Sequence, residues 1–236
     1  MDRRELPHNA LVLLTALLFS YLIYFIFLRV PVAQIEAGGI AQKIFYFHMP
    51  SAYAMYLSGF VCFVASAAYL VRPTDGRDAW ARAGAEVAVV FGLFLLVSGP
   101  LWAKKAWGVY WAWEPRLVTT MLSVLIYVAI VVLRAFAGDG EAERKFAAAL
   151  GVLGTINLPI IHYSVQKWGG MHPQVVGKGG GGLRHPDMRS ALVMGLLVMT
   201  LLAALLLWQR ARLAIARARL TRAEQHAAGL GLLDGA

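Results

Sequence analysis

The chain has 236 residues, of which 59% are hydrophobic and only 15% are charged. Because an ordinary soluble domain carries about 25% charged residues, this composition excludes a soluble globular protein. The formal net charge is +9, but in a membrane protein the placement of Lys and Arg along the chain says more than their sum.

Six apolar blocks follow one another along the chain, and several reach the roughly 20 residues that a helix needs to cross a bilayer. They cover residues 9–28, 51–71, 84–102, 117–136, 146–163 and 188–208. The blocks lack the ~10-residue alternation of barrel strands, and only helices or closed barrels satisfy every backbone group in lipid. We therefore predict an all-α, polytopic membrane protein, a six-transmembrane-helix bundle that forms one domain over residues 1–208.

The first block begins like a signal peptide, with charged residues ahead of an apolar run. The run is longer than the roughly 7 to 15 residues of a signal-peptide core and no A-x-A site follows, so we expect it to remain as a span. The only cysteine, Cys62, lies within the second block. A single cysteine excludes a disulfide framework, a C-x-x-C pair and a C-x-x-C-H cofactor attachment site.

Lys and Arg are divided unevenly between the two sides that six spans define. With the N-terminus inside, thirteen lie in inner segments and nine in outer segments, and this bias favours cytoplasmic N- and C-termini. The sequence WQRARLAIARARLTR predicts a basic cytoplasmic tail over residues 209–236, which either leans on anionic lipid or simply anchors the topology. Glu86, close to the inner end of the third span, is expected to be solvated.

Six spans place the first, third and fifth loops on one face, here the outer one, and the three unusual segments of the chain fall in these loops. His48 stands just ahead of Pro50 and Ser51, which resemble a helix start, so we expect it at the outer mouth of the second span. His162 follows Pro159, which should bend the fifth span near its outer end. A single interfacial histidine needs no ligand, but two at matching depth beside an aromatic loop favour a shared site.

Two further histidines, His172 and His185, lie in the fifth loop on either side of a GKGGGG run. Glycine does little to fix the position of its neighbours, so we expect both to be ordinary loop residues. His185, with the Pro186 and Asp187 that follow it, predicts the start of the sixth span.

The third loop, WAKKAWGVYWAWEPRL at residues 102–117, holds four of the seven tryptophans. Trp and Tyr gather at membrane interfaces, but such belts are spread over all spans, whereas these rings are concentrated in one loop. If the loop is helical, Trp107 and Trp111 share a face and Trp113 turns away, while Gly108 permits close approach. A wall of flat rings beside Lys and Arg suits a large planar ligand with anionic edges, and two neutral imidazoles suit a metal at its centre. Together these features describe haem.

The segment WGVYWAWEPRL resembles the tryptophan-rich WWD signature, W-G-x-x-W-x-W-D-x-R-L, of haem-handling proteins of cytochrome c maturation. The flanking FYFHMPSAY and NLPIIHYSVQKW segments resemble those of the CcmC (haem exporter protein C) family, and the likeness covers about residues 43–186. It implies an outward-facing WWD loop that contacts the porphyrin and two histidines, His48 and His162, as axial ligands of the haem iron. The loop residues implied to contact haem are Trp107, Gly108, Trp111, Trp113, Glu114, Arg116 and Leu117.

The same resemblance implies a function and partners. Family members present haem b, held non-covalently and transiently, to the membrane-anchored chaperone CcmE, and they work with the ABC transporter subunits CcmA and CcmB and the small membrane protein CcmD. We thus expect a binding and transfer protein of the bacterial cytoplasmic (inner) membrane, with its haem site on the periplasmic side. It would have the lipid bilayer but no nucleic acid as a partner and no catalytic residue of its own. Outer basic residues, Arg116 foremost, would neutralise the haem propionates.

Two features depart from the family pattern. Glu114 stands where the family usually has Asp, and the Pro115 that follows biases Glu114 toward an extended backbone. The glycine run at residues 179–182 is loose for a segment close to a site.

Three other functions stay open at this point. A direct haem–apocytochrome c synthetase of the same WWD superfamily would be longer, with extra histidines and further spans. A membrane solute transporter subunit would show internal repeats, broken helices and polar groups at the bilayer midplane. A b-type electron-transfer cytochrome would commonly bury its histidine pair within the spans.

Overall fold

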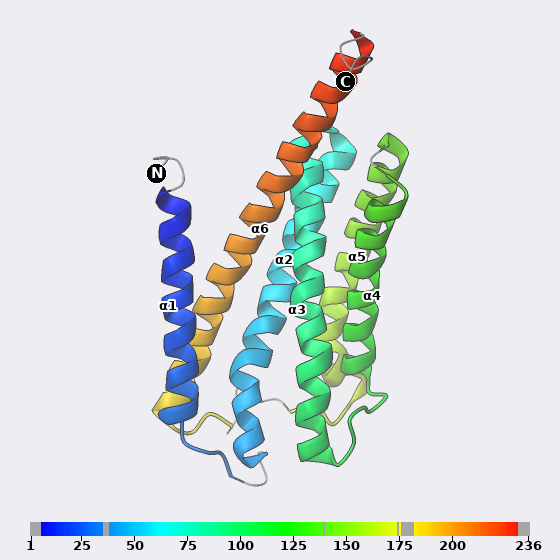
Figure 1. Ribbon diagram of the computed structural model, residues 1–236. Helices are drawn as coiled ribbons and strands as arrows, with labels where there is room; N and C mark the ends of the chain where they lie inside the picture. Colours follow the sequence, from blue (N-terminus) through cyan, green and yellow to red (C-terminus); the bar gives the residue numbers. More distant parts are fainter. Residues whose placement is uncertain (1–5, 35–37, 139, 174, 176–181, 231–236) are drawn as a thin grey trace.

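The computed structural model describes residues 6–34, 38–138, 140–173, 175 and 182–230, and within these ranges the chain is helical, with no strand. Six helices are long and apolar enough to cross a membrane, which confirms the predicted six-helix bundle (Figure 1). The elements are α1 (Leu6–Leu28), the short 3₁₀ helix η2 (Gly39–Ile44), α2 (Phe45–Val71), α3 (Asp75–Trp107), α4 (Pro115–Phe136), α5 (Glu141–Trp168) and α6 (Pro186–Gly229).

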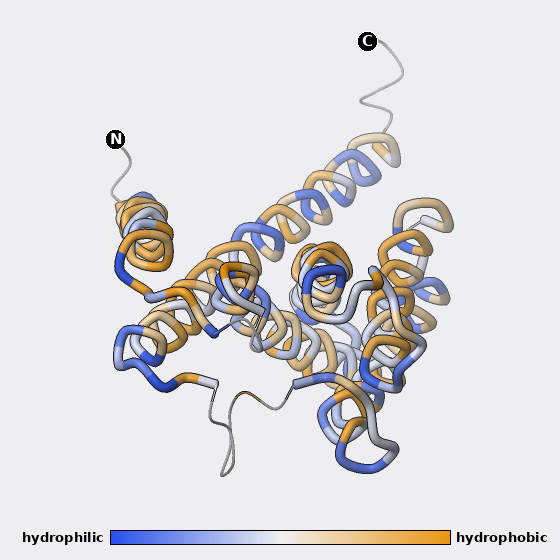
Figure 2. The backbone as a smooth tube through the Cα atoms, turned by 90° about the horizontal axis from the view of Figure 1, so that it is seen from below, coloured by the Kyte–Doolittle hydropathy of each residue, from blue (hydrophilic) through white to orange (hydrophobic). Residues whose placement is uncertain are grey.

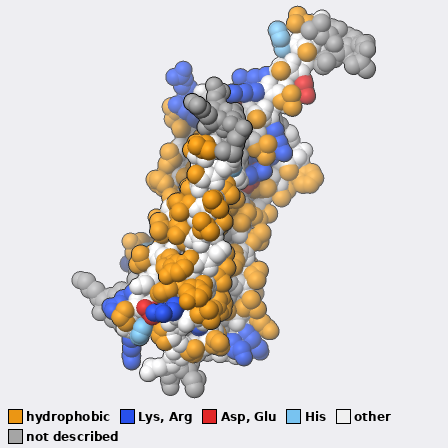
Figure 3. All heavy atoms as spheres, turned by 60° about the vertical axis from the view of Figure 1, so that its left-hand side comes forward, with side chains coloured by type: hydrophobic (Ala, Val, Ile, Leu, Met, Phe, Trp, Pro, Cys, Tyr) orange, Lys and Arg blue, Asp and Glu red, His pale blue; other side chains and the backbone are white. Residues whose placement is uncertain are grey.

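Consecutive helices are antiparallel (Figure 1). α2 packs against α3, α5 and α6, while α1 packs against α6 at one edge of the bundle and the α4–α5 pair lies at the other. Viewed from one end, the helices are mostly hydrophobic, and hydrophilic residues gather in the connections and along the far half of α6 (Figure 2). Apolar side chains cover the middle of the face in Figure 3, with Lys and Arg toward both ends, as expected for helices surrounded by lipid.

Small residues allow α2 and α3 to approach closely. At Gly84 of α3, an added Cβ atom would lie 2.5 Å from the backbone nitrogen of Cys62 in α2. Lipid offers little hydrophobic driving force for bringing helices together, so close packing of this kind is a main source of helix association in membranes.

Gly84→Ala should therefore lower the stability of the protein, although alanine is the better helix former. The added methyl group meets backbone that cannot rotate away, and overpacking of this kind typically costs about 1–3 kcal/mol. The melting temperature of the purified protein in detergent measures the effect. Gly76→Ala on the same helix is the control, because nothing lies within 4 Å of a Cβ atom there; equal melting of the two variants would contradict the tight α2–α3 contact.

The start of α2 differs from the predicted one. The sequence predicts a helix start at Pro50 and Ser51, but α2 begins at Phe45 and η2 directly precedes it, so that Pro50 lies inside the helix. The prediction was wrong because a proline near the start of a helix removes few hydrogen bonds, and the chain can form an earlier turn ahead of it. His48 consequently belongs to the first turn of α2 rather than to a loop.

α6 continues without a break from the last predicted span to Gly229, across the predicted boundary at residue 208. It packs along α3, and the Arg210 side chain lies 2.5 Å from the Glu86 carboxylate. Glu86 also accepts a hydrogen bond from Arg82 at 3.0 Å, and its side chain is only 15% exposed. The expectation that Glu86 is solvated is therefore wrong, because the sequence does not show that α6 runs on as a helix beside α3.

Candidate functional site

The three segments singled out in the sequence lie at one end of the bundle, which we call the tryptophan end and define by residues 38–48, 98–117 and 162–172. The first turns of α2, α4 and α6 lie at this end of the bundle, as do the last turns of α3 and α5 (Figure 1). This arrangement confirms that the first, third and fifth loops share one face of the bundle.

His48 is held in place by α3. Its ring Nδ1 lies 2.8 Å from the hydroxyl oxygen of Ser98, and that hydroxyl donates its own proton to the Phe94 carbonyl at 2.7 Å. Since a hydroxyl group has only one proton, the Nδ1–H group of His48 must be the donor to Ser98. In the neutral ring the lone pair then lies on Nε2, and a histidine fixed in this way is prepared to bind a metal through Nε2.

The tryptophan-rich loop is not helical between Trp107 and Trp111. α3 ends at Trp107, and Gly108 caps it in the left-handed conformation, with φ 78°, a common way for helices to end. The Lys104 ammonium donates to the Gly108 carbonyl at 2.9 Å. A helical loop would have placed Trp107 and Trp111 on one face, but this condition is not met, because Gly108 ends the helix between them.

The indole rings form two edge-to-face pairs instead. Trp102 and Trp107 have ring centroids 5.3 Å apart, and Trp111 and Trp113 have centroids 5.8 Å apart, a preferred geometry for aromatic rings. Trp113 is 78% exposed, whereas the other three rings are half-buried. The loop thus combines mutually packed rings with exposed flat apolar surface.

Glu114 connects this loop to the segment that follows α5. Its backbone is extended, with φ −93° and ψ 155°, and Pro115 begins α4, as the sequence predicts. Glu114 is buried, with only 6% of the residue exposed. Its Oε2 accepts the backbone N–H of His172 at 3.1 Å, and Oε1 lies 3.3 Å from Nδ1 of the same histidine. Gly170 permits this approach, because a Cβ atom there would lie 2.8 Å from Oε2.

Burial alone would raise the pKa of the Glu114 carboxyl, but the His172 ring and the backbone N–H groups of Met171 and His172 outweigh burial and lower this pKa below its ordinary value. The carboxylate is therefore ionised at neutral pH. Since the folded pKa is lowered, the contribution of Glu114 to stability is fully present above the ordinary pKa of 4.5 and is lost as the pH falls through the lowered value.

Glu114→Ala should free the turn that contains His172. Hydrogen bonds to charged groups contribute about 1.5–3 kcal/mol, so we expect the backbone amide of His172 to exchange its proton roughly ten- to a hundredfold faster. Hydrogen exchange of a peptide covering residues 169–173 measures this rate. Glu114→Gln keeps a carbonyl acceptor and should give an intermediate rate; wild-type rates in both variants would show that this side chain does not fix the turn.

His162 and Arg116 meet through the backbone rather than through the imidazole ring. His162 is exposed, and its ring packs edge to face on Tyr163 at 4.9 Å. The Arg116 guanidinium donates from Nη2 to the His162 carbonyl oxygen at 3.1 Å. Its Nε atom is buried and finds no acceptor among the described residues, while Leu117 beside it is half-buried.

His172 is the residue that sequence reasoning undervalued. It is not an ordinary loop residue, because it is held against Glu114. It also lies close enough to His48 for the charges of the two rings to interact. The signal in the sequence is the preceding Gly169-Gly170 pair, since paired glycines mark turns. These residues adopt φ values of 75° and 149° and turn the chain back toward the bundle after α5.

His185 behaves as the sequence predicts. It precedes the first residue of α6, and its ring Nδ1 accepts the backbone N–H of Asp187 at 3.2 Å, which caps the helix. The glycine run at residues 179–182 lies outside the described residues except for Gly182.

Known proteins resemble this chain over most of its length. The sequence model of one family, described as CcmC: Heme exporter protein C, matches residues 4–228. The chain is 34% identical to Heme exporter protein C of Bradyrhizobium diazoefficiens over 161 residues, which cover 67% of the chain and 61% of that relative. It is 32% identical to Heme exporter protein C of Escherichia coli K12 over 179 residues, 74% of the chain and 70% of the relative. The corresponding protein of Haemophilus influenzae is 30% identical over 135 residues, 57% of the chain and 54% of the relative.

Proposed function

The chain belongs to the CcmC (Heme exporter protein C) family, and from this premise we propose that it binds haem at the tryptophan end and hands it on during cytochrome c maturation. Haem is cargo in this proposal, and the chain supplies a surface that receives, orients and releases it.

The observation that carries the proposal is the fixed ring of His48. The hydrogen bond from Nδ1 to Ser98 leaves Nε2 as the basic nitrogen, which is the atom that a histidine most often offers to haem iron. His48 lies in the first turn of α2, at the same end of the bundle as the tryptophan-rich loop with its exposed Trp113. A basic histidine nitrogen at the same end of the bundle as flat apolar rings suits the centre and the face of a porphyrin.

Other side chains of the loop also match haem. The buried Nε of Arg116 is a donor without an acceptor among the described residues, and guanidinium groups pair well with carboxylates such as the haem propionates. We propose that Trp107, Gly108, Trp111, Trp113 and Leu117 form the surface against the porphyrin. Glu114 is already engaged with His172, so we propose that it positions the His172 turn rather than touching the porphyrin.

Two histidines compete for the second axial position. The resemblance to the family implies His162, at the end of α5, but its ring is exposed and packs on Tyr163. The contacts of His172 support the other choice, since it is held by a buried carboxylate and lies within electrostatic reach of His48. We therefore propose His48 and His172 as the axial pair, with His162 as the alternative.

Holding the iron and the propionates would leave the opposite, vinyl-bearing edge of the haem accessible to an acceptor. We propose that the acceptor is the chaperone CcmE, and that this chain contributes by orientation, which lowers the barrier to transfer without a nucleophile of its own. In this proposal the tryptophan end faces the periplasm, the protein sits in the bacterial inner membrane, and CcmA, CcmB and CcmD complete the complex.

The haem content of the purified protein tests the proposal. Protein expressed in haem-producing cells and purified in detergent should show a Soret band, and Trp107→Leu combined with Trp111→Leu should remove most of it. Trp80→Leu is the matched control, because Trp80 is a partly exposed tryptophan near the start of α3, at the other end of the bundle. Wild-type protein without haem, or equal haem loss in both variants, would contradict the proposed site.

A further inference from the structure

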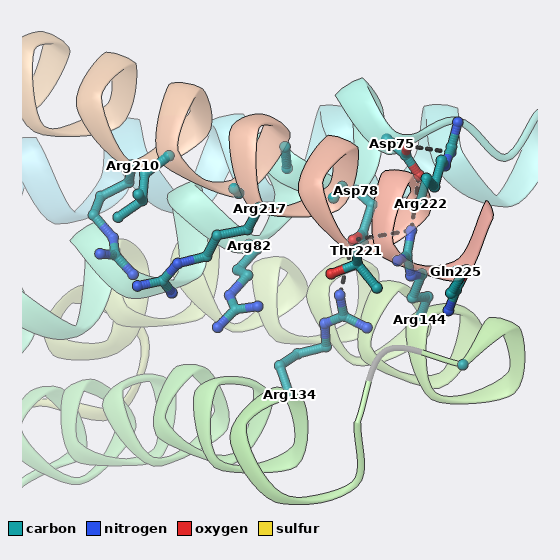
Figure 4. A pocket seen from close by; sticks show the side chains of 15 residues that line it. Asp75, Asp78, Arg82, Arg134, Arg144, Arg210, Arg217, Thr221, Arg222 and Gln225 are labelled. Atoms are coloured by element: carbon teal, nitrogen blue, oxygen red, sulfur yellow. Dashed lines mark hydrogen bonds and ion pairs between the residues drawn. The ribbon is translucent and has the colours of Figure 1, made fainter. Parts of the chain in front are cut away.

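At the end of the bundle opposite to the tryptophan end, a cleft of about 490 Å³ lies between the second half of α6 and the adjoining ends of α3, α4 and α5 (Figure 4). Its volume is within the range of sites for small ligands. The charged residues that line it are six arginines and two aspartates: Arg82, Arg134, Arg144, Arg210, Arg217, Arg222, Asp75 and Asp78.

The aspartates hold part of the cleft wall together. Arg134 of α4 donates to Asp78 of α3 at 2.8 Å, and Arg144 of α5 donates to Asp75 at 3.0 Å. Arg222 of α6 also pairs with Asp75. These ion pairs join four helices around the cleft, so the arginines are held by the fold rather than scattered on a flexible tail.

Arg217 is in a different situation. Its side chain is exposed and lines the cleft, and in the part of the chain that the structure describes it makes no hydrogen bond or ion pair. Figure 4 shows its guanidinium group between those of Arg210 and Arg82, which both bond the Glu86 carboxylate. Like charges gathered in this way repel one another, and an anion between them would relieve the repulsion.

We propose that this cleft is a binding site for a phosphate-bearing anion, held by Arg217 together with Arg210 and Arg82. Guanidinium groups bind phosphate oxygens in pairs and are weakly hydrated, which makes arginine well suited to phosphate. The lining also includes Leu213 and Ala214, which provide an apolar wall. The phosphate has two possible sources, the headgroup of an anionic phospholipid and a soluble diphosphate, and basic pockets between membrane helices commonly take the first.

Native mass spectrometry of the full-length protein in detergent tests the proposal with three probes: cardiolipin, phosphatidylcholine and inorganic pyrophosphate. We expect cardiolipin to bind more tightly than phosphatidylcholine, and Arg217→Gln to weaken the binding about fivefold, the usual effect of one basic residue near a membrane surface. Arg219→Gln is the matched control, because Arg219 is exposed two residues further along α6 and does not line the cleft.

The measurement with pyrophosphate distinguishes the two sources of the phosphate. Pyrophosphate that binds alone, depends on Arg217 and displaces cardiolipin supports a soluble ligand, whereas binding of cardiolipin alone supports a lipid headgroup. Equal weakening by Arg217→Gln and Arg219→Gln would overturn the proposal, since it would show diffuse attraction to a basic surface. Equal binding of cardiolipin and phosphatidylcholine with no binding of pyrophosphate would overturn it as well. None of these outcomes depends on haem.

Discussion

His48→Ala is expected to remove at least about nine tenths of the haem that co-purifies with the protein. His48 is the histidine whose basic Nε2 is set by the hydrogen bonds of Ser98. Even changes to the partners that orient a metal-binding histidine weaken the metal site about 10- to 100-fold, so loss of the ligand itself should cost at least as much. The pyridine haemochrome content per protein measures the effect.

The other histidines make this experiment specific. We expect His172→Ala to lose haem or shift the Soret band, and His162→Ala to keep both haem and band position. His226→Ala is the control for expression and folding, because His226 is exposed near the far end of α6. If His162→Ala loses haem and His172→Ala keeps it, the axial pair is His48 and His162; if His48→Ala keeps its haem, the proposed site is wrong.

Asp78→Asn should cause the largest loss of stability of any single substitution considered. The Arg134 side chain is only 3% exposed, and its Nη2 lies 2.8 Å from the Asp78 carboxylate, which also lies 3.7 Å from Arg144. Removing one partner of a buried ion pair leaves the other charge poorly compensated and typically costs about 3–5 kcal/mol. Asparagine keeps the volume of the side chain, so a loss of stability would be due to removal of the negative charge. Equilibrium unfolding in mixed micelles measures the free energy of unfolding.

Glu141→Gln is the control for this prediction. Glu141 also forms an ion pair, with Lys145, but the two side chains are 70% and 51% exposed, and exposed pairs contribute little. We expect this variant to unfold like the wild type. If Asp78→Asn is equally stable, the ion pairs between α3, α4 and α5 do not hold this end of the bundle together.

The sequence was sufficient for the six spans and for the shared face of the three loops, because both follow from apolar length and from the parity of the spans. It also predicted the extended backbone of Glu114 and the start of α6 at His185 and Pro186, since these depend on neighbouring residues in the chain. These two features, which depend on neighbouring residues alone, are therefore predictable here without a structure.

Features that depend on distant contacts were missed. The burial of Glu86 follows from Arg210, which is 124 residues away, and the fixed position of His172 follows from Glu114, 58 residues before it. The end of α3 at Gly108 is a local feature, but a glycine inside an aromatic run is compatible with both a helix and a turn. The hydrogen bond of His48 to Ser98 likewise required the packing of α2 on α3, 50 residues apart.

The most direct test of the proposed function is a measurement of haem transfer to CcmE. Membranes that contain CcmE, prepared with and without this protein, are separated under denaturing conditions, and covalently bound haem is detected on the CcmE band. We predict haem on CcmE only when this protein is present, and its loss when His48→Ala replaces the wild type. Equal amounts of haem on CcmE with and without this protein would contradict the proposal that it delivers haem to CcmE.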